Sequence, residues 1–204
     1  MSWSNLSAGL SQALTLGFAE PAVEIDAACH TGEALSLALG EPIRFVHVGT
    51  LRPARVSLRL MLPSRDIDLA FPTTVDGTEN AELHSRWLSS RNAHGQTIRH
   101  NLMSLRTTHG IEVHVQVRAL PFTPMAQLYV VNRTTVLFSY SMITRRGAEP
   151  PISADIYDAA TNGVETLGTF QAGMDNDRET TFVEQSQLWF DSVWNTISTE
   201  LSLS

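Results

Sequence analysis

The chain has 204 residues, of which 43% are hydrophobic and 17% charged, a balance typical of a folded protein and too apolar for disorder. All 14 basic residues are arginine, and a chain without lysine cannot form a Schiff base, a P-loop phosphate contact or a catalytic ammonium group. These counts exclude pyridoxal enzymes, P-loop NTPases and protein kinases, and the length predicts one domain with appended helices.

The charges are segregated along the chain. Residues 1–43 hold five acids and no base, residues 44–146 hold thirteen arginines against six acids, and residues 147–204 hold ten acids and one arginine. Such segregation indicates either two faces of one fold that attract each other or a basic pocket for an anionic ligand. We favour the first interpretation, and expect arginines of residues 86–118 to lie against acids of residues 149–191.

Targeting and redox signals are few. No stretch approaches the roughly 18 uncharged apolar residues of a membrane helix, and the segment from Met1 to Phe18 lacks the basic start of a secretory signal. The single cysteine, Cys29, excludes an intramolecular disulfide and a multi-cysteine zinc site. We therefore expect a cytoplasmic protein without membrane association.

Hydrophobic periodicity predicts the elements in chain order. The first half is expected to contain a helix over 5–17, a strand over 22–28, a helix from Thr31 to a stop at Gly40, an apolar stretch of uncertain type over 43–48, a strand over 54–62 and a loop over 64–78. The second half is expected to contain a helical segment over 79–108 with a candidate break at Gly95, a strand over 111–117, a rigid loop over 121–124, strands over 128–131 and 134–140 joined by a tight turn at Asn132-Arg133, a polar loop over 144–153, a short strand over 156–158 and a helix over 179–201.

Strands that alternate with helices predict an α/β fold, with a mixed, largely parallel sheet covered by helices and a long C-terminal helix. We expect an N-terminal helix in residues 1–20 and a single α/β domain over residues 21–204. The last helix has apolar residues along one side, which favours core packing, or else a dimer contact, over a cofactor-binding surface. They are Phe182, Trp189, Phe190, Val193, Trp194 and Ile197.

Chemical motifs are weak. Glu112 and His114 share one strand face, and His109 and His100 precede them, but the spacing matches no known metal motif, so surface histidines are favoured and no metal is predicted. Cys29 and His30 lie between a strand and a helix, where a thiolate can be activated, although a buried structural cysteine is the favoured interpretation. The chain has no G-x-S-x-G and no G-x-G-x-x-G motif, so no serine hydrolase and no dinucleotide cofactor are predicted.

Nucleic-acid binding would require a basic helix or interleaved aromatic residues. The segment 79–108 is basic and partly helical, but most of the remaining chain is acidic, and a solvated helix face is the favoured interpretation. Its arginines are Arg86, Arg91, Arg99 and Arg106. We expect no direct binding of nucleic acid by this chain.

One segment resembles a known family. The run TPMAQLYVVNRTTVLFSY, residues 123–140, resembles the region around the H-x-K-x4-D motif of phospholipase D-like domains, and it follows a helix ending in THG, the strand IEVHVQVRAL and a Pro-containing loop. On this sequence the motif's His falls on Met125, its Lys on Gln127 and its Asp on Asn132. The resemblance therefore implies the fold and argues against the activity.

The C-terminal run FVEQSQLWFDSVWNTIS, residues 182–198, resembles the end of effector domains attached to GntR-type winged-helix regulators of bacteria. In that arrangement a winged-helix module precedes the effector domain. Residues 1–43 contain no Lys or Arg and so supply no phosphate-binding surface. We expect either a stand-alone sensor or a DNA-binding half that was left off or is encoded separately.

The favoured hypothesis is a catalytically inactive regulatory or ligand-sensing domain that binds a small polar or anionic ligand, or a protein partner, where the lost active site would lie. No cofactor is predicted, and a homodimer is considered as an alternative to a monomer. The predicted ligand-binding residues are Gln127, Tyr129, Asn132, Ser139, Ser141, Arg99 and Arg118. The alternatives are a divergent phosphodiesterase or hydrolase that uses His and carboxylates, and a structural dimerisation module. An enzyme needs a His beside a carboxylate in a pocket, a sensor needs a pocket without a nucleophile, and a dimerisation module needs an exposed apolar patch.

Overall fold

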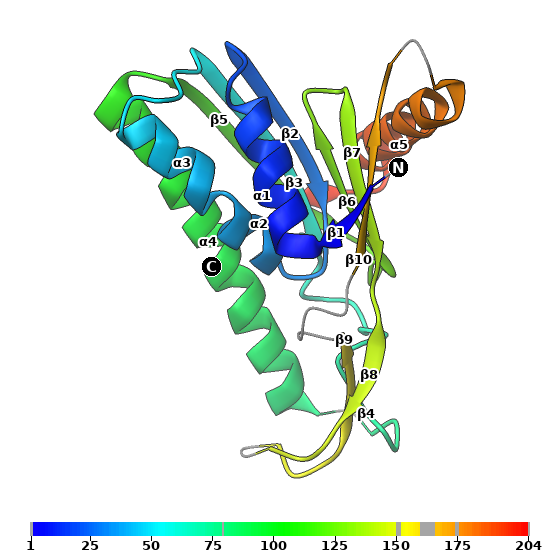
Figure 1. The fold of residues 1–204 in the computed structure, drawn as a ribbon. Helices are drawn as coiled ribbons and strands as arrows, with labels where there is room; N and C mark the ends of the chain where they lie inside the picture. The colour runs from blue at the N-terminus through cyan, green and yellow to red at the C-terminus, as the bar shows by residue number, and fades with distance from the viewer. Residues whose placement is uncertain (1, 79, 150–151, 160–165, 174–175, 204) are drawn as a thin grey trace.

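The fold is known from a computed structural model, which describes residues 2–78, 80–149, 152–159, 166–173 and 176–203. Within them, an eight-stranded sheet has helices on both faces, and a three-stranded sheet projects from one end (Figure 1). The helices are α1 (Leu6–Gly17), α2 (Glu33–Ala38), α3 (Gly40–His47), α4 (Ala81–His109) and α5 (Asp177–Thr196).

The large sheet has the strand order β1-β10-β7-β6-β2-β3-β5-β11, and the small sheet has the order β4-β9-β8. In the large sheet the strands are, in spatial order, β1 (Ser2–Asn5), β10 (Thr166–Gln171), β7 (Thr135–Tyr140), β6 (Ala126–Val131), β2 (Ala22–Ala28), β3 (Arg55–Pro63), β5 (Glu112–Leu120) and β11 (Thr199–Glu200). In the small sheet they are β4 (Thr73–Thr74), β9 (Ile156–Ala159) and β8 (Ile143–Arg146).

The predicted α/β class, the mixed sheet and the long C-terminal helix are confirmed. The expectation that the sheet is largely parallel needs correction, because only the pairs β2·β3 and β3·β5 are parallel and the other pairs are antiparallel. The parallel pairs are joined through helices, whereas β6 and β7 form a hairpin, which requires antiparallel strands. The chain also reverses in the short loop between β5 and β6, so β6 lies antiparallel beside β2.

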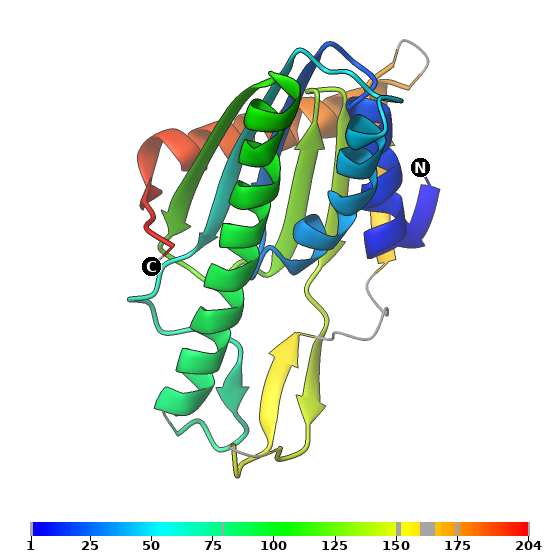
Figure 2. The same cartoon turned by 90° about the vertical axis from the view of Figure 1, so that its left-hand side faces the viewer.

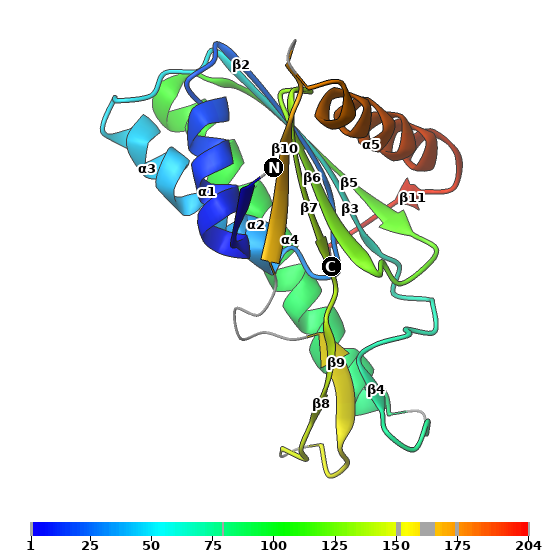
Figure 3. The same ribbon diagram turned by 45° about the vertical axis from the view of Figure 1, so that its right-hand side comes forward.

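The two faces of the sheet carry separate apolar cores. Helices α1 to α4 cover one face, where Leu14, Leu39 and Leu102 pack against Ile25 and Leu58 of the strands. Helix α5 crosses the other face (Figure 3), and its residues Val183, Phe190 and Trp194 belong to the second core. Helix α1 is thus an integral part of the first core, although its segment was expected as an appended N-terminal helix.

Local chemistry explains the element boundaries. Asn80 caps α4 by accepting a hydrogen bond from the Leu83 N–H at 2.9 Å, and Gly110 ends the helix in the left-handed conformation, at φ 67°. The predicted turn at Asn132-Arg133 is confirmed, since both residues have positive φ, 51° and 59°, and the Thr134 N–H donates to the Val131 carbonyl at 3.2 Å, as in a type I′ turn.

Three predicted boundaries were wrong for physical reasons. Gly40 does not stop a helix but begins α3, which covers the stretch of uncertain type. Gly95 does not break α4, because it lies against the Leu203 side chain, where a Cβ would meet Leu203 Cδ2 at 2.8 Å. Helix α5 ends at Thr196 instead of residue 201, because Thr199 and Glu200 pair with β5 as β11.

Other differences concern strands and one helix face. The polar loop expected over 144–153 contains most of β8, while its residues 150–151 lie outside the described residues. Strand β10 was not predicted. Helix α5 buries Phe190, Val193 and Trp194 as expected, but it leaves Trp189 43% and Ile197 49% exposed, since its buried positions recur at helical spacing from Val183.

Candidate functional site

Four of the predicted ligand-binding residues lie together at one edge of the large sheet. Strands β2, β3 and β5 end at this edge, where β6 begins, and it faces the small sheet (Figures 1 and 2). Gln127 of β6 is paired with Ser139 of β7, and Ser141 lies two residues further on, where its N–H donates to the Met125 carbonyl at 2.9 Å. The Tyr129 hydroxyl donates to Gln127 Oε1 at 2.6 Å. Alternation along the strands puts these four side chains on the face that α1 to α4 cover.

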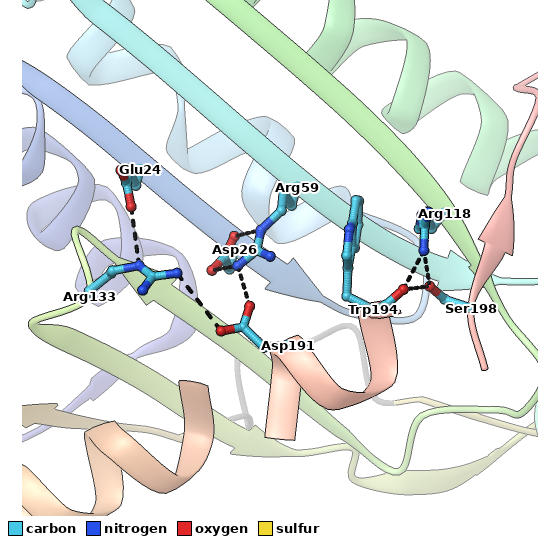
Figure 4. Close-up of polar contacts among 8 residues, drawn as sticks. All are labelled: Glu24, Asp26, Arg59, Arg118, Arg133, Asp191, Trp194 and Ser198. Atoms are coloured by element: carbon cyan, nitrogen blue, oxygen red, sulfur yellow. Dashed lines mark hydrogen bonds and ion pairs between the residues drawn. The ribbon is translucent and has the colours of Figure 1, made fainter. Parts of the chain in front are cut away.

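The other three predicted residues lie elsewhere. Asn132 is at the opposite end of β6, where its Oδ1 accepts from the Glu24 N–H at 2.8 Å and its Nδ2 donates to the Gly17 carbonyl at 3.1 Å. Arg99 is exposed on α4. Arg118 lies on the α5 face, where it donates to the Trp194 carbonyl (Figure 4). The structure therefore does not bring these residues to the edge that holds Gln127.

Strand β2 delivers Cys29 and His30 to the same edge, because Ala28 is paired with Leu128. Burial raises the pKa of the Cys29 thiol to about 12, although a Gly32 backbone hydrogen bond and the Tyr129 hydroxyl oppose the shift. The thiol is therefore protonated at neutral pH and is no nucleophile. The prediction of a buried structural cysteine is confirmed.

His30 is an unusual group for the interior of a protein. Its side chain is 7% exposed, and neither Nδ1 nor Nε2 has a hydrogen-bond partner in the described part of the chain. Burial lowers its pKa to about 4, so the ring is neutral at pH 7. The ring contacts Phe71 and Trp87 at centroid distances of 4.6 and 5.7 Å.

Arg91 of α4 contacts the same Trp87 ring that His30 contacts, and its guanidinium carbon lies 5.3 Å from the centre of that ring. The Arg91 side chain is fully buried. Its Nη1 donates to the Pro63 carbonyl at 2.5 Å, and its Nε and Nη2 donate to Asn92 Oδ1 at 3.1 and 2.7 Å. Burial lowers its pKa to about 10, so it remains a cation at neutral pH.

Two more buried polar atoms at this edge lack partners among the described residues. They are Trp87 Nε1 and Ser141 Oγ. Phe71, which covers His30, belongs to the loop between β3 and β4, and the Ala70 N–H donates to Thr123 Oγ1 at 2.9 Å. Sequence reasoning did not select Phe71, Trp87 or Arg91 as site residues, because the signal is the joint burial of polar groups from separate segments.

The histidines do not assemble a metal site in the described residues. His114 contacts Glu112 at 2.8 Å, but both side chains are more than 60% exposed. His109 lies 2.8 Å from His47 of α3, across exposed helix ends, instead of joining that pair. The arrangement agrees with the prediction of surface histidines in this region.

The opposite face of the sheet carries an ion-pair network that fixes α5 (Figure 4). Arg59 binds Asp26 through two hydrogen bonds of 2.7 and 2.6 Å and contacts Asp191 of α5 at 2.8 Å. Arg133 of the hairpin turn contacts Glu24 at 3.3 Å and Asp191 at 3.8 Å. The hydrogen bond with Asp26 and the charges of Asp26 and Asp191 raise the pKa of Arg59.

This network revises the expected charge matching. The central basic segment does meet C-terminal acids, but the described ion pairs use Arg59, Arg133, Arg145 and Arg146. Of residues 86–118, Arg86 acts on Asp158 through its charge without a described ion pair. In the small sheet, Arg145 binds Asp155 at 2.7 Å. The arginines of α4 lie on its exposed surface, apart from the buried Arg91.

Neither a family model nor a curated protein matches the chain. Among solved structures, the chain is similar to TrmBL2, an archaeal chromatin protein whose structure shows a novel mode of DNA binding, with a TM-score of 0.42 and 9% identity over 98% of this chain and 54% of that one. It is also similar to a phosphatidylserine synthase of Haemophilus influenzae Rd KW20, with a TM-score of 0.44 and 9% identity over 98% of this chain and 39% of that one.

The chain thus spans about half or less of the length of either structure. Both TM-scores lie below 0.5, so these likenesses decide neither the fold family nor the function. They give no support to the resemblance to GntR-type regulators. Among the described residues, no helix combines the length and apolar character needed to cross a bilayer.

Proposed function

We propose that this chain is a catalytically inactive regulatory domain, with a degenerate phospholipase D-like site, that senses a small polar or anionic ligand at the sheet edge beside His30. The observation that carries the proposal is the set of buried polar atoms without described partners at that edge, on His30, Trp87 and Ser141. A buried polar atom without a hydrogen-bond partner costs free energy, so a ligand that forms hydrogen bonds with these atoms gains binding free energy.

The degenerate motif supports inactivity. Met125 has no ionisable group that could replace the catalytic His and no proton to exchange, and Gln127 cannot supply the charge of a phosphate-binding Lys. Asn132 bonds to Glu24 and Gly17 at the far end of β6, so it is occupied in supporting the backbone. At the edge itself, the Cys29 thiol is held protonated by burial. The role in the cell would then be regulation, within or beside a transcriptional regulator.

Hydrolysis of bis-p-nitrophenyl phosphate tests the inactivity. The wild-type chain and the variant Gln127→Ala should release p-nitrophenol at the same background rate. Gln116→Ala, an exposed glutamine on β5, is the matched control. A wild-type rate well above background that Gln127→Ala abolishes and Gln116→Ala preserves would overturn the proposal in favour of the divergent phosphodiesterase.

A second candidate function, a dimerisation module, is favoured by exposed apolar side chains near the small sheet. Met125 is 56%, Tyr140 70%, Met142 48% and both Ile143 and Tyr157 39% exposed. A cluster of exposed apolar residues is typical of an interaction surface. Light scattering across a concentration series would show a dimer that Ile143→Glu weakens, whereas a monomer at every concentration excludes this function.

A further inference from the structure

The buried Arg91 lacks a described carboxylate partner for its charge. A charge removed from water is costly unless an opposite charge and hydrogen bonds compensate for it. The three described hydrogen bonds of Arg91 end on neutral oxygens, of Pro63 and Asn92. A guanidinium carries five N–H groups, so two of them are left over by these bonds. The nearby charges of Arg65 and Asp66 act on Arg91 in opposite directions, and the exposed Asp66 forms no described ion pair with it.

The neighbours of Arg91 also offer donors. Trp87 Nε1 is an N–H without a described partner, and the neutral His30 ring has one N–H and one acceptor nitrogen, both unpaired. The contact of the Trp87 ring with both Arg91 and His30 joins the three side chains in one cluster. The cluster therefore has more unpaired hydrogen-bond donors than acceptors, and an anion is the ligand that matches them.

The size and charge of that anion follow from the same residues. One cation beside a neutral imidazole balances one negative charge, so a monoanion fits better than a phosphate dianion. The rings of Phe71 and Trp87 border His30, which favours a ligand with an apolar body. The unpartnered atoms are shielded from solvent, so the ligand must be small.

From this geometry we infer that the cluster of Arg91, Trp87 and His30 is a binding site for a small organic monocarboxylate. The carboxylate takes the free N–H groups of Arg91 and the Trp87 Nε1 hydrogen, and its apolar body packs against the aromatic rings. His30 completes the site with a hydrogen bond. The inference rests on the proposed sensor function and gives it a ligand class.

Access to the cluster requires the loop between β3 and β4 to move. Phe71 of this loop is 1% exposed and packs on His30. The loop is tied down by the Ala70 bond to Thr123 and by the contact of His84 Nε2 with the Arg65 carbonyl at 3.0 Å. Opening it breaks these contacts and exposes the buried Phe71 ring, so ligand binding is coupled to the conformation of the loop.

Calorimetric titration of the whole chain with benzoate, acetate, benzamide and inorganic phosphate tests the assignment. Saturable binding is expected for benzoate, with weaker binding of acetate, whereas the neutral isostere benzamide should not bind. Arg91→Met should abolish benzoate binding, and Arg99→Met, which removes the same charge from the exposed part of α4, should leave it unchanged. Because Arg91→Met can disturb the Pro63 contact, Trp87→Phe is the second variant. It keeps a ring and removes the N–H, and should weaken binding about tenfold or more.

Several results would overturn the inference. They are no saturable binding of either carboxylate, equal binding of benzamide, tighter binding of phosphate than of benzoate, and benzoate binding that survives both Arg91→Met and Trp87→Phe. A failure of this inference is distinguishable from a failure of the sensor proposal. The latter fails when the chain hydrolyses bis-p-nitrophenyl phosphate through Gln127, whatever benzoate does.

Discussion

Trp194 gives the sharpest test of the packing between α5 and the sheet. Its side chain is 6% exposed, stacks on Phe190 at a centroid distance of 5.9 Å, and lies under the guanidinium groups of Arg59 and Arg118 at 5.5 and 4.9 Å. Large aromatic side chains bury about 150–250 Å², and the loss of about 160 Å² on truncation to Ala costs about 4 kcal/mol at about 25 cal/mol per Å². Each cation–π contact adds about 0.5–1 kcal/mol, and relaxation of the cavity offsets part of the loss.

We therefore expect Trp194→Ala to lower the free energy of unfolding by about 3–5 kcal/mol. Trp189→Ala, five positions earlier on the same helix and 43% exposed, should lower it by less than about 1 kcal/mol. Urea denaturation followed by circular dichroism measures both, with equal m-values as the condition for comparing midpoints. Equal losses for the two variants, or a loss below about 1 kcal/mol for Trp194→Ala, would refute the packing described above.

Three further predictions follow from the described side chains. His30 takes up a proton at its ordinary pKa of 6.5 when the chain is unfolded but only near pH 4 when it is folded, so the free energy of unfolding should fall by up to about 3 kcal/mol as pH falls across that interval. Urea denaturation at several pH values should show no such decrease for His30→Phe, whereas the exposed control His100→Phe should retain it. Cys29 should react with Ellman's reagent only after denaturation, and rapid labelling of the native chain would contradict its burial. A duplex DNA titration at about 50 mM salt, where electrostatic binding is strong, should show no binding tighter than micromolar, because the net charge is −7.

Local sequence patterns predicted much of the fold. Strict alternation identified β2, β3 and β5, and Asn132-Arg133 identified the hairpin turn. These elements depend on residues within a few positions of one another, so periodicity detects them. Strand β11 was missed because its two residues form a strand only by pairing with β5, some eighty positions earlier. Gly95 was misjudged for the same reason, since Leu203 contacts it from the end of the chain.

The candidate site was predicted only in part. The family resemblance led to Gln127, Tyr129, Ser139 and Ser141, which the structure brings to one edge. It also led to Asn132, Arg99 and Arg118, which lie elsewhere. The cluster of Arg91, Trp87 and His30 has no sequence signature, because its members come from one helix and the end of β2, and their significance depends on burial without partners. Helical spacing does place Arg91 on the buried side of α4, four residues after Trp87 and four before Gly95, but spacing alone does not show that its partners are neutral.

A comparison of two arginines bears most directly on the role of the site. Arg59 is only partly buried, yet it has two carboxylate partners, Asp26 and Asp191. Arg91 is fully buried, yet its described hydrogen bonds end on neutral oxygens. Since the cost of desolvation rises with burial, a chain that used both arginines only for stability would place its carboxylates the other way round. A carboxylate that binds from solution would supply the missing charge partner of Arg91, and the chain would then be more stable with the ligand bound than without it.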